Sequence, residues 1–201
     1  MLIIPQPDDR TACIIGIDPG TRFMGLGVIF FNVLNLEIIQ SGSTLLRGDA
    51  LIENEDHIAF HGSRFARLHG IENRLHSFFT SLNPLCVAAE SNFMNTNRPT
   101  AYGALVESVA CIRSALFRHR ALMELDLIEP SPVKNAVGCK GNAGKEDVNA
   151  GVERLNPILK YVGISAIKDL TEHETDGLAI AYWRYLLLVN HAQALNQFKG
   201  S

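Results

Sequence analysis

The sequence predicts an α/β fold in which a mixed sheet, beginning with three antiparallel strands, is flanked by helices. Three apolar runs follow one another before residue 41 with only short polar turns between them, which is typical of an antiparallel meander. After residue 56, segments with helical spacing of apolar residues alternate with short apolar runs, which indicates helices layered on a sheet.

The first three strands are predicted at residues 12–18, 24–31 and 34–40. Asp-Pro-Gly-Thr joins the first two, and a short turn at residues 32–33 joins the second to the third. The first strand ends on an acid, Asp18, and taken alone this motif is better explained by a turn of this composition than by a functional role.

A helix is predicted at residues 57–82 because apolar residues recur there at spacings of three and four. They are Phe65, Leu68, Ile71, Leu75, Phe78 and Leu82. Asn-Pro ends this helix, and the short apolar run 85–90 that follows is predicted as a fourth strand. It closes on Glu90 in the same way that the first strand closes on Asp18.

The rest of the chain continues the alternation of helices and strands. A helix is predicted at 100–119 with Thr100 as its cap, and then a strand at 124–129. Further helices are predicted at 131–137, 146–155 and 173–191, with a glycine-rich loop before the second of these.

No linker or internal repeat divides the chain, so a single domain is predicted. We expect an N-terminal extension at 1–11, the domain at 12–191 and a C-terminal tail at 192–201.

Composition excludes several classes of protein. Of the 201 residues, 47% are apolar and 19% are charged, which argues against disorder, and no apolar run approaches the length of a membrane span. The N-terminus lacks the basic region of a signal peptide, and four dispersed cysteines form no CxxC pair. Cys13, Cys86 and Cys111 are predicted as core thiols of an intracellular protein in a reducing compartment, either bacterial or phage-infected cytoplasm or an organelle.

Charge is unevenly distributed along the sequence. The net charge of −3 counts against a polyanionic partner, because affinity for phosphates comes mainly from lysine and arginine. Lys134, Lys140 and Lys145, however, fall in a stretch without acids, whereas acids crowd into residues 49–56. A phosphate-binding face therefore remains compatible with the sequence, although each lysine could equally be a solvated surface charge.

Asp18 and Glu90 end strands, and Asp176 lies in the first turn of the last predicted helix, three residues after His173. If the strands are neighbours, three carboxylates and an imidazole converge, and like charges so close need a counter-charge. Such ligands suit Mg²⁺ or Mn²⁺, and two ions about 3.5–4 Å apart can hydrolyse a phosphodiester. Glu172 or Glu174 could reach a metal in place of His173.

Four motifs, in this order, resemble the RuvC family of Holliday-junction resolvases. They are Gly16-Ile17-Asp18-Pro19-Gly20-Thr21 with Gly25-Leu26-Gly27-Val28-Ile29, Val87-Ala88-Ala89-Glu90 with Phe93-Met94, Pro132-Val133-Lys134 with the loop to Lys145, and His173-Glu174-Thr175-Asp176-Gly177-Leu178-Ala179. The likeness covers residues 14 to about 185.

The resemblance implies an RNase H-like fold with a five-stranded sheet, and a homodimer that binds branched DNA, chiefly four-way junctions. It implies Mg²⁺-dependent nicking of two strands, leaving 5′-phosphate and 3′-hydroxyl ends, with neither a nucleotide cofactor nor a membrane partner. The implied roles are metal binding and catalysis by Asp18, Glu90, His173 and Asp176, contact with the scissile phosphate by Lys134 and Lys145, DNA binding by Lys140, and base stacking by Phe93.

Two other functions compete with this one. The Asp18 hairpin also resembles the phosphate-binding hairpin of actin-like and sugar-kinase-like ATP-binding modules, but the loop from Gly138 to Lys145 does not fit the P-loop pattern. The second alternative is a protein that binds branched DNA without cutting it.

Overall fold

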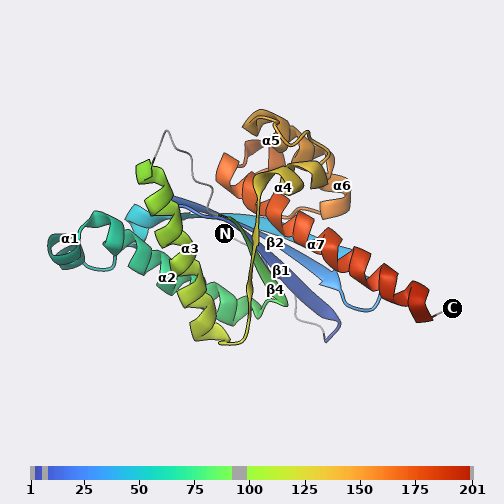
Figure 1. The fold of residues 1–201 in the computed structure, drawn as a ribbon, viewed down its shortest axis with the longest axis horizontal. Helices are drawn as coiled ribbons and strands as arrows, with labels where there is room; N and C mark the ends of the chain where they lie inside the picture. Colours follow the sequence, from blue (N-terminus) through green and yellow to red (C-terminus); the bar gives the residue numbers. More distant parts are fainter. Residues whose placement is uncertain (1–2, 6–8, 92–98, 200–201) are drawn as a thin grey trace.

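The computed structural model describes residues 3–5, 9–91 and 99–199 (Figure 1). These residues contain five strands: β1 (Thr11–Asp18), β2 (Phe23–Asn32), β3 (Ile38–Arg47), β4 (Cys86–Glu90) and β5 (Leu125–Ile128). The helices are η1 (Gly48–Leu51), α1 (Glu55–His61), α2 (Ser63–Leu82), α3 (Pro99–His119), α4 (Pro130–Ala136), α5 (Lys145–Arg154), α6 (Asn156–Leu159), η2 (Ile167–Asp169) and α7 (Glu172–Lys199).

The strands form one mixed sheet in the order β3-β2-β1-β4-β5. β1, β2 and β3 pair antiparallel, whereas β4 pairs parallel with β1, and β5 pairs parallel with β4. The predicted five-stranded mixed sheet with three antiparallel strands first is therefore confirmed.

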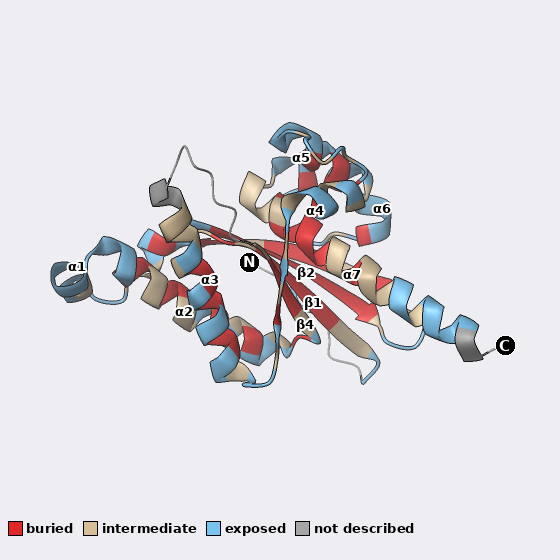
Figure 2. Cartoon of the chain, viewed as in Figure 1, coloured by how far each residue is buried: buried red, intermediate tan, exposed pale blue. Residues whose placement is uncertain are grey.

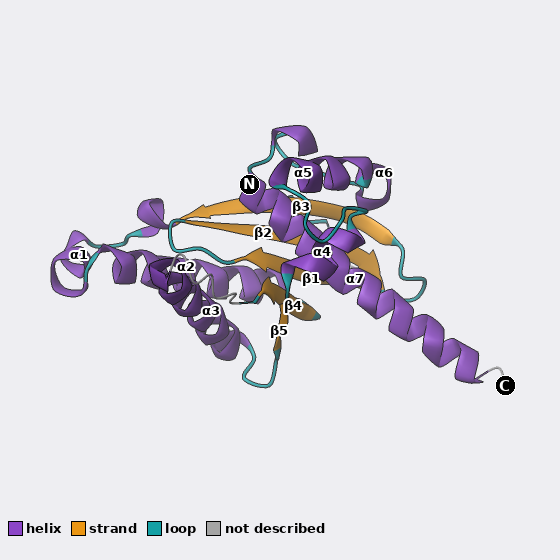
Figure 3. Cartoon of the chain, turned by 45° about the horizontal axis from the view of Figure 1, so that its top comes forward, coloured by secondary structure: helices purple, strands orange, loops and turns teal. Residues whose placement is uncertain are grey.

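Helices cover both faces of the sheet, with α2 and α3 on one face and α4 to α7 on the other (Figure 3). Each face of the sheet has its own hydrophobic core, and alternate residues of β1 pack into one or the other. Ile15 and Ile17 share a core with Ile71 of α2, whereas Ile14 shares the other with Leu178 of α7. A strand enclosed in this way is apolar on both sides, which explains the near-continuous apolar runs. Figure 2 shows the strands buried along most of their length.

The predicted third strand was wrong in position, because β3 begins at Ile38 and runs to Arg47. Residues 33–37 form a turn instead: the Asn32 carboxamide accepts a hydrogen bond from the Leu34 amide at 2.8 Å, and Leu36 adopts a left-handed backbone with φ of 60°. The polar sequence Ser-Gly-Ser at 41–43 gives no strand signal, yet it is buried and pairs with β2.

Two helix boundaries also differ from the prediction. The helix predicted at 57–82 is two helices, α1 and α2, because Gly62 has a φ of 82° and breaks the run between them. The last helix continues to Lys199 instead of ending at residue 191, since no glycine or proline interrupts it there. Its final turns are exposed beyond the sheet (Figure 2).

All four cysteines are free thiols, and Cys13 and Cys111 are buried as predicted. Cys86 is only half-buried, because it starts β4 near the end of the sheet. Among the helices of the described ranges, none combines the length and the apolar character needed to cross a membrane.

Candidate active site

The register of the parallel strands brings two acids together. Ile17 of β1 lies opposite Ala89 of β4, so the next residues, Asp18 and Glu90, end neighbouring strands at the same edge of the sheet. Both side chains are partly buried there. The predicted proximity of these two strand-terminal acids therefore follows from the pairing.

Glycines bring the start of α7 onto this edge. Gly25 pairs with Asp18 across β1 and β2, and a Cβ atom on Gly25 would lie only 1.8 Å from the His173 carbonyl oxygen. A Cβ on Gly27 would lie 2.3 Å from the Leu178 amide nitrogen, and one on Gly177 would lie 2.8 Å from the Gly27 nitrogen. Strand and helix backbones touch here, which only glycine permits.

This contact places His173 against Asp18. The Nδ1 of His173 donates a hydrogen bond to Asp18 Oδ2 at 2.6 Å, and this bond raises the pKa of the imidazole. The Phe23 ring stacks on the imidazole, with ring centroids 5.9 Å apart and planes 24° from parallel. The orientation of His173 is therefore fixed from two sides.

The two glutamates that flank His173 face other partners. Glu172 Oε1 pairs with Lys145 Nζ at 2.6 Å. Glu174 accepts hydrogen bonds from the Thr171 amide at 3.2 Å and from the Thr171 hydroxyl at 2.9 Å, and its own amide donates to that hydroxyl. This reciprocal arrangement is a capping box that starts α7. Of the three candidates, His173 is the one that contacts Asp18.

The carboxylates raise one another's affinity for protons. Burial raises the pKa of Glu90 to about 7, and the nearby charges of Asp18 and Asp176 contribute to the increase. Burial also raises the pKa of Asp176 to about 6, again with a contribution from Asp18. The mutual effects mean that all three carboxylates and His173 form one cluster at the sheet edge, as predicted from the sequence.

Two of the predicted lysines lie beside this cluster. Lys134 Nζ donates a hydrogen bond to the Ala143 carbonyl at 2.7 Å, which ties α4 to the glycine-rich loop. The pKa of Glu90, raised chiefly by burial, is lowered in turn by the charges of Lys134 and Lys145. The structure therefore brings two cations to the acidic cluster.

Lys140 has a different setting. It is exposed in the loop between α4 and α5, where it lines a pocket of about 460 Å³ together with Asp147 and Arg154. Phe93 lies outside the described residues.

Residues that the sequence analysis missed support the start of α7 from the β3 side. The buried Ser43 hydroxyl donates to Glu174 Oε1 at 3.3 Å and shares a 3.0 Å hydrogen bond with the Tyr161 hydroxyl. The Thr171-x-x-Glu174 spacing is a local signal that could have identified the cap. Ser43 and Tyr161, 118 residues apart, carry no such signal.

The donor set of the cluster suits a hard divalent cation, because carboxylate oxygens with one imidazole are ligands that Mg²⁺ and Mn²⁺ accept. Burial raises the pKa values of Glu90 and Asp176 and charge repulsion adds to the increase, and a positive ion would offset that repulsion. Within the described part of the chain, no group of three or more His, Cys, Asp and Glu side chains has the arrangement needed to hold a metal. In this structure the Asp18 carboxylate and the His173 imidazole form a hydrogen bond with each other.

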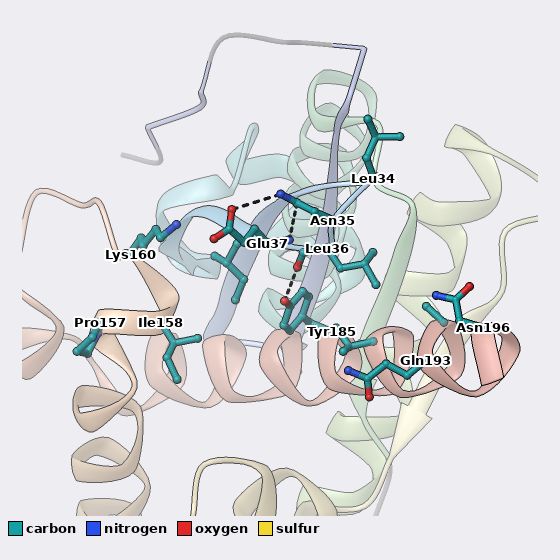
Figure 4. Close-up of a pocket in the computed structure, with 13 residues that line it drawn as sticks. Leu34, Asn35, Leu36, Glu37, Pro157, Ile158, Lys160, Tyr185, Gln193 and Asn196 are labelled. Atoms are coloured by element: carbon teal, nitrogen blue, oxygen red, sulfur yellow. Dashed lines mark hydrogen bonds between the residues drawn. The ribbon is translucent and has the colours of Figure 1, made fainter. Parts of the chain in front are cut away.

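A pocket of about 500 Å³ lies away from this cluster, beside the turn between β2 and β3 (Figure 4). Its polar groups bond within the chain: the Tyr185 hydroxyl donates to the Leu36 carbonyl at 2.5 Å, and the Asn35 carboxamide donates to Glu37 at 3.3 Å. Because β2 runs from the cluster to this turn, the pocket is at the opposite end of the strands and is not part of the site.

Comparison with known sequences gives one consistent family. The family model described as crossover junction endodeoxyribonuclease RuvC matches residues 14–182. A crossover junction endodeoxyribonuclease RuvC from Pelodictyon phaeoclathratiforme is 32% identical over 153 residues, which cover 72% of this chain and 70% of that protein. The protein of the same name from Myxococcus xanthus is 30% identical over 181 residues, covering 90% of this chain and 82% of that protein.

Solved structures share the fold. The structure described as Thermus thermophilus RuvC in complex with Holliday junction substrate has a TM-score of 0.63 at 24% identity, covering 86% of this chain and 92% of that chain. The yeast mitochondrial Holliday junction resolvase Ydc2 has a TM-score of 0.60 at 13% identity, covering 96% of this chain and 87% of that chain. These similarities confirm the predicted RNase H-like fold.

Proposed function

The chain belongs to the RuvC family of crossover junction endodeoxyribonucleases, and on that premise we propose that it resolves four-way DNA junctions. The reaction is paired nicking by phosphodiester hydrolysis, which leaves 5′-phosphate and 3′-hydroxyl ends. The substrate range extends to other branched DNA. The family resemblance extends the proposal to a homodimer, which would bring one catalytic centre to each of the two nicked strands.

One observation carries this proposal: Asp18, Glu90, Asp176 and His173, distant in the sequence, meet at one sheet edge. A fold that needs only stability would not bury like charges together, because each raises the energy of the others. A cluster of this kind is typical of a site that binds a cation and a reacting phosphate.

We assign these four side chains to two divalent ions, Mg²⁺ with Mn²⁺ as a substitute. Such ions, when bound, supply an activated water and stabilise the leaving oxygen of the phosphodiester. The hydrogen bond from His173 Nδ1 holds the Asp18 carboxylate in orientation, and α7 positions Asp176 one turn further on. The carboxylates must be deprotonated to bind metal.

Lys134 and Lys145 offset the negative charge that develops on the scissile phosphate. Both ammonium groups act on Glu90, so they lie within electrostatic range of the reacting centre. We assign DNA contact to Lys140 on the glycine-rich loop, and base stacking near the crossover to Phe93.

The test is incubation of the chain with a panel of four-way, forked, flapped and linear DNAs in Mg²⁺, in Mn²⁺ and in EDTA, with mapping of the cut ends. We expect symmetric nicks in the four-way junction in either metal and none in EDTA. Binding without nicks in both metals would instead support a protein that only binds branched DNA.

Asp18→Asn should keep junction binding and lower nicking by at least roughly a hundredfold, since metal-borne stabilisation of the transition state is worth several kcal/mol. Asp56→Asn, the same change at an exposed position on α1, is the control and should cut like the wild type. Full activity of Asp18→Asn would contradict the assigned metal site.

A further inference from the structure

A second set of residues borders the catalytic cluster on its β3 side. Phe23 begins β2 and Arg47 ends β3, and the two are cross-strand partners in the sheet. The Arg47 guanidinium lies 5.9 Å from the centroid of the Phe23 ring, and that ring stacks on His173. We name Arg22, Phe23 and Arg47 the β2–β3 rim.

The two arginines of the rim differ from other arginines of the chain. Arg64, Arg118 and Arg184 each pair with a carboxylate. Arg22 and Arg47 are exposed, and neither forms an ion pair with any residue that the structure describes. The uncompensated charge of Arg47 therefore lies one aromatic ring away from His173, and Arg22 directly precedes that ring in the chain.

A backbone hydrogen bond and close packing at Gly48 fix the main chain that carries these two arginines. The Gly48 amide donates a hydrogen bond to the Arg22 carbonyl at 2.8 Å, which joins the β1–β2 turn to the end of β3. A Cβ on Gly48 would lie 2.5 Å from the Thr21 carbonyl oxygen and 3.1 Å from side-chain atoms of Arg67. Arg67, which is 9% exposed, holds Asp49 of η1 through an ion pair of 3.1 Å.

The rim and the lysine of α4 stand on different sides of the cluster. In the strand order, β2 and β3 lie on one side of β1 and β4, whereas α4 directly follows β5 on the other. A DNA strand that passes over Asp18 and Glu90 would meet Lys134 on one side and the rim on the other. Arginine forms charge-assisted, bidentate hydrogen bonds with phosphate, which suits it to hold a backbone in place.

Resting on the proposed function, we propose that Arg22 and Arg47 bind phosphates of the cleaved DNA strand on the β3 side of the catalytic cluster. The Phe23 ring connects this surface to the cluster, because it contacts the Arg47 guanidinium and stacks on His173. The ligand of this surface is the sugar-phosphate backbone, so its contribution is independent of base sequence.

The test is the salt dependence of binding to an immobile four-way DNA junction, measured in EDTA so that no strand is cut. Each phosphate contact contributes about −0.9 to the slope of log affinity against log salt concentration. We expect Arg47→Gln to make the slope shallower by about 0.9, and Arg22→Gln with Arg47→Gln together by roughly 1.8.

Two controls separate this role from a general loss of charge or fold. Arg47→Lys keeps the charge and should retain the wild-type slope. Arg120→Gln removes an arginine that directly follows α3 and donates a hydrogen bond to the Asn83 carboxamide at 2.9 Å, at the end of the sheet away from Glu90. It should also leave the slope unchanged.

If the wild-type chain binds and cuts junctions, and the single and double rim variants keep the wild-type salt slope, this proposal is overturned while the proposed function stands. A slope reduced equally by Arg120→Gln would also overturn it, because the effect would then come from net charge. A wild-type chain that does not bind the junction would overturn the proposed function and this inference together.

Discussion

Glu90 ends β4 in a position where protonation is unusually favourable, since burial holds its pKa at about 7. The folded pKa of Glu90 therefore exceeds the ordinary value of 4.5, which describes the unfolded chain. Protonated Glu90 stabilises the fold below that ordinary value, and this contribution is lost as pH rises through about 7. Asp176 acts in the same direction, with a pKa of about 6 instead of 3.8.

This predicts how metal-free stability depends on pH. Between pH ~5 and ~8 in EDTA, the free energy of unfolding of the wild type should fall relative to that of Glu90→Gln, because glutamine has no proton to lose. Urea unfolding of both proteins at the two pH values measures the difference. A gap between the proteins that stays constant with pH would contradict the raised pKa.

The contact between α7 and β2 is the element-scale feature on which the cluster depends. His173 and Asp176 reach Asp18 only because the helix backbone rests directly on Gly25 and Gly27. Any side chain on this strip of β2 would push the helix away from the sheet. The glycines of the sequence motif therefore determine the geometry of the site although none of them carries a reactive group.

Gly25→Ala should destabilise the chain by more than about 2 kcal/mol and abolish cleavage, because the new methyl group overlaps a backbone atom that cannot move alone. Gly103→Ala is the matched control: Gly103 lies in α3 with nothing within 4 Å of an added Cβ. It should stabilise the chain by roughly 0.5–1 kcal/mol. Thermal unfolding and junction cleavage measure both effects; equal stability of the two variants would contradict the contact.

Elements with a strong local pattern could be predicted, whereas those set by tertiary contacts could not. β1, β2 and β4 are apolar on both faces, which makes them visible in the sequence. β3 contains Ser41-Gly42-Ser43, which becomes a buried strand only because β2 supplies its hydrogen-bond partners. The break at Gly62 depends on a left-handed backbone that a helical periodicity cannot reveal.

At the scale of the whole molecule, the convergence of Asp18, Glu90, His173 and Asp176 could be predicted because each stands at a strand or helix end. The sequence could not distinguish His173 from Glu172 and Glu174. That choice depends on contacts with distant segments: Lys145 engages the first glutamate, and Ser43 engages the second. The role assigned to Phe93 stays a prediction.

The last turns of α7 extend beyond the sheet and are mostly exposed (Figure 2). We propose that residues 192–201 are a tail outside the domain. A chain that ends at residue 191 should lose less than about 1 kcal/mol of stability, because residues 193–197 are exposed and helical turns with little packing are marginal in water. It should also keep its junction cleavage rate. Denaturant unfolding and the gel assay test this; loss of folding on truncation would place the tail inside the domain.

Translation makes β1 and β4 before α7, the helix that carries His173 and Asp176. Until α7 packs on Gly25, Asp18 lacks its hydrogen bond with His173. On the proposed function, a product that stops before residue 172 therefore lacks two of the four assigned metal ligands and should not cut DNA.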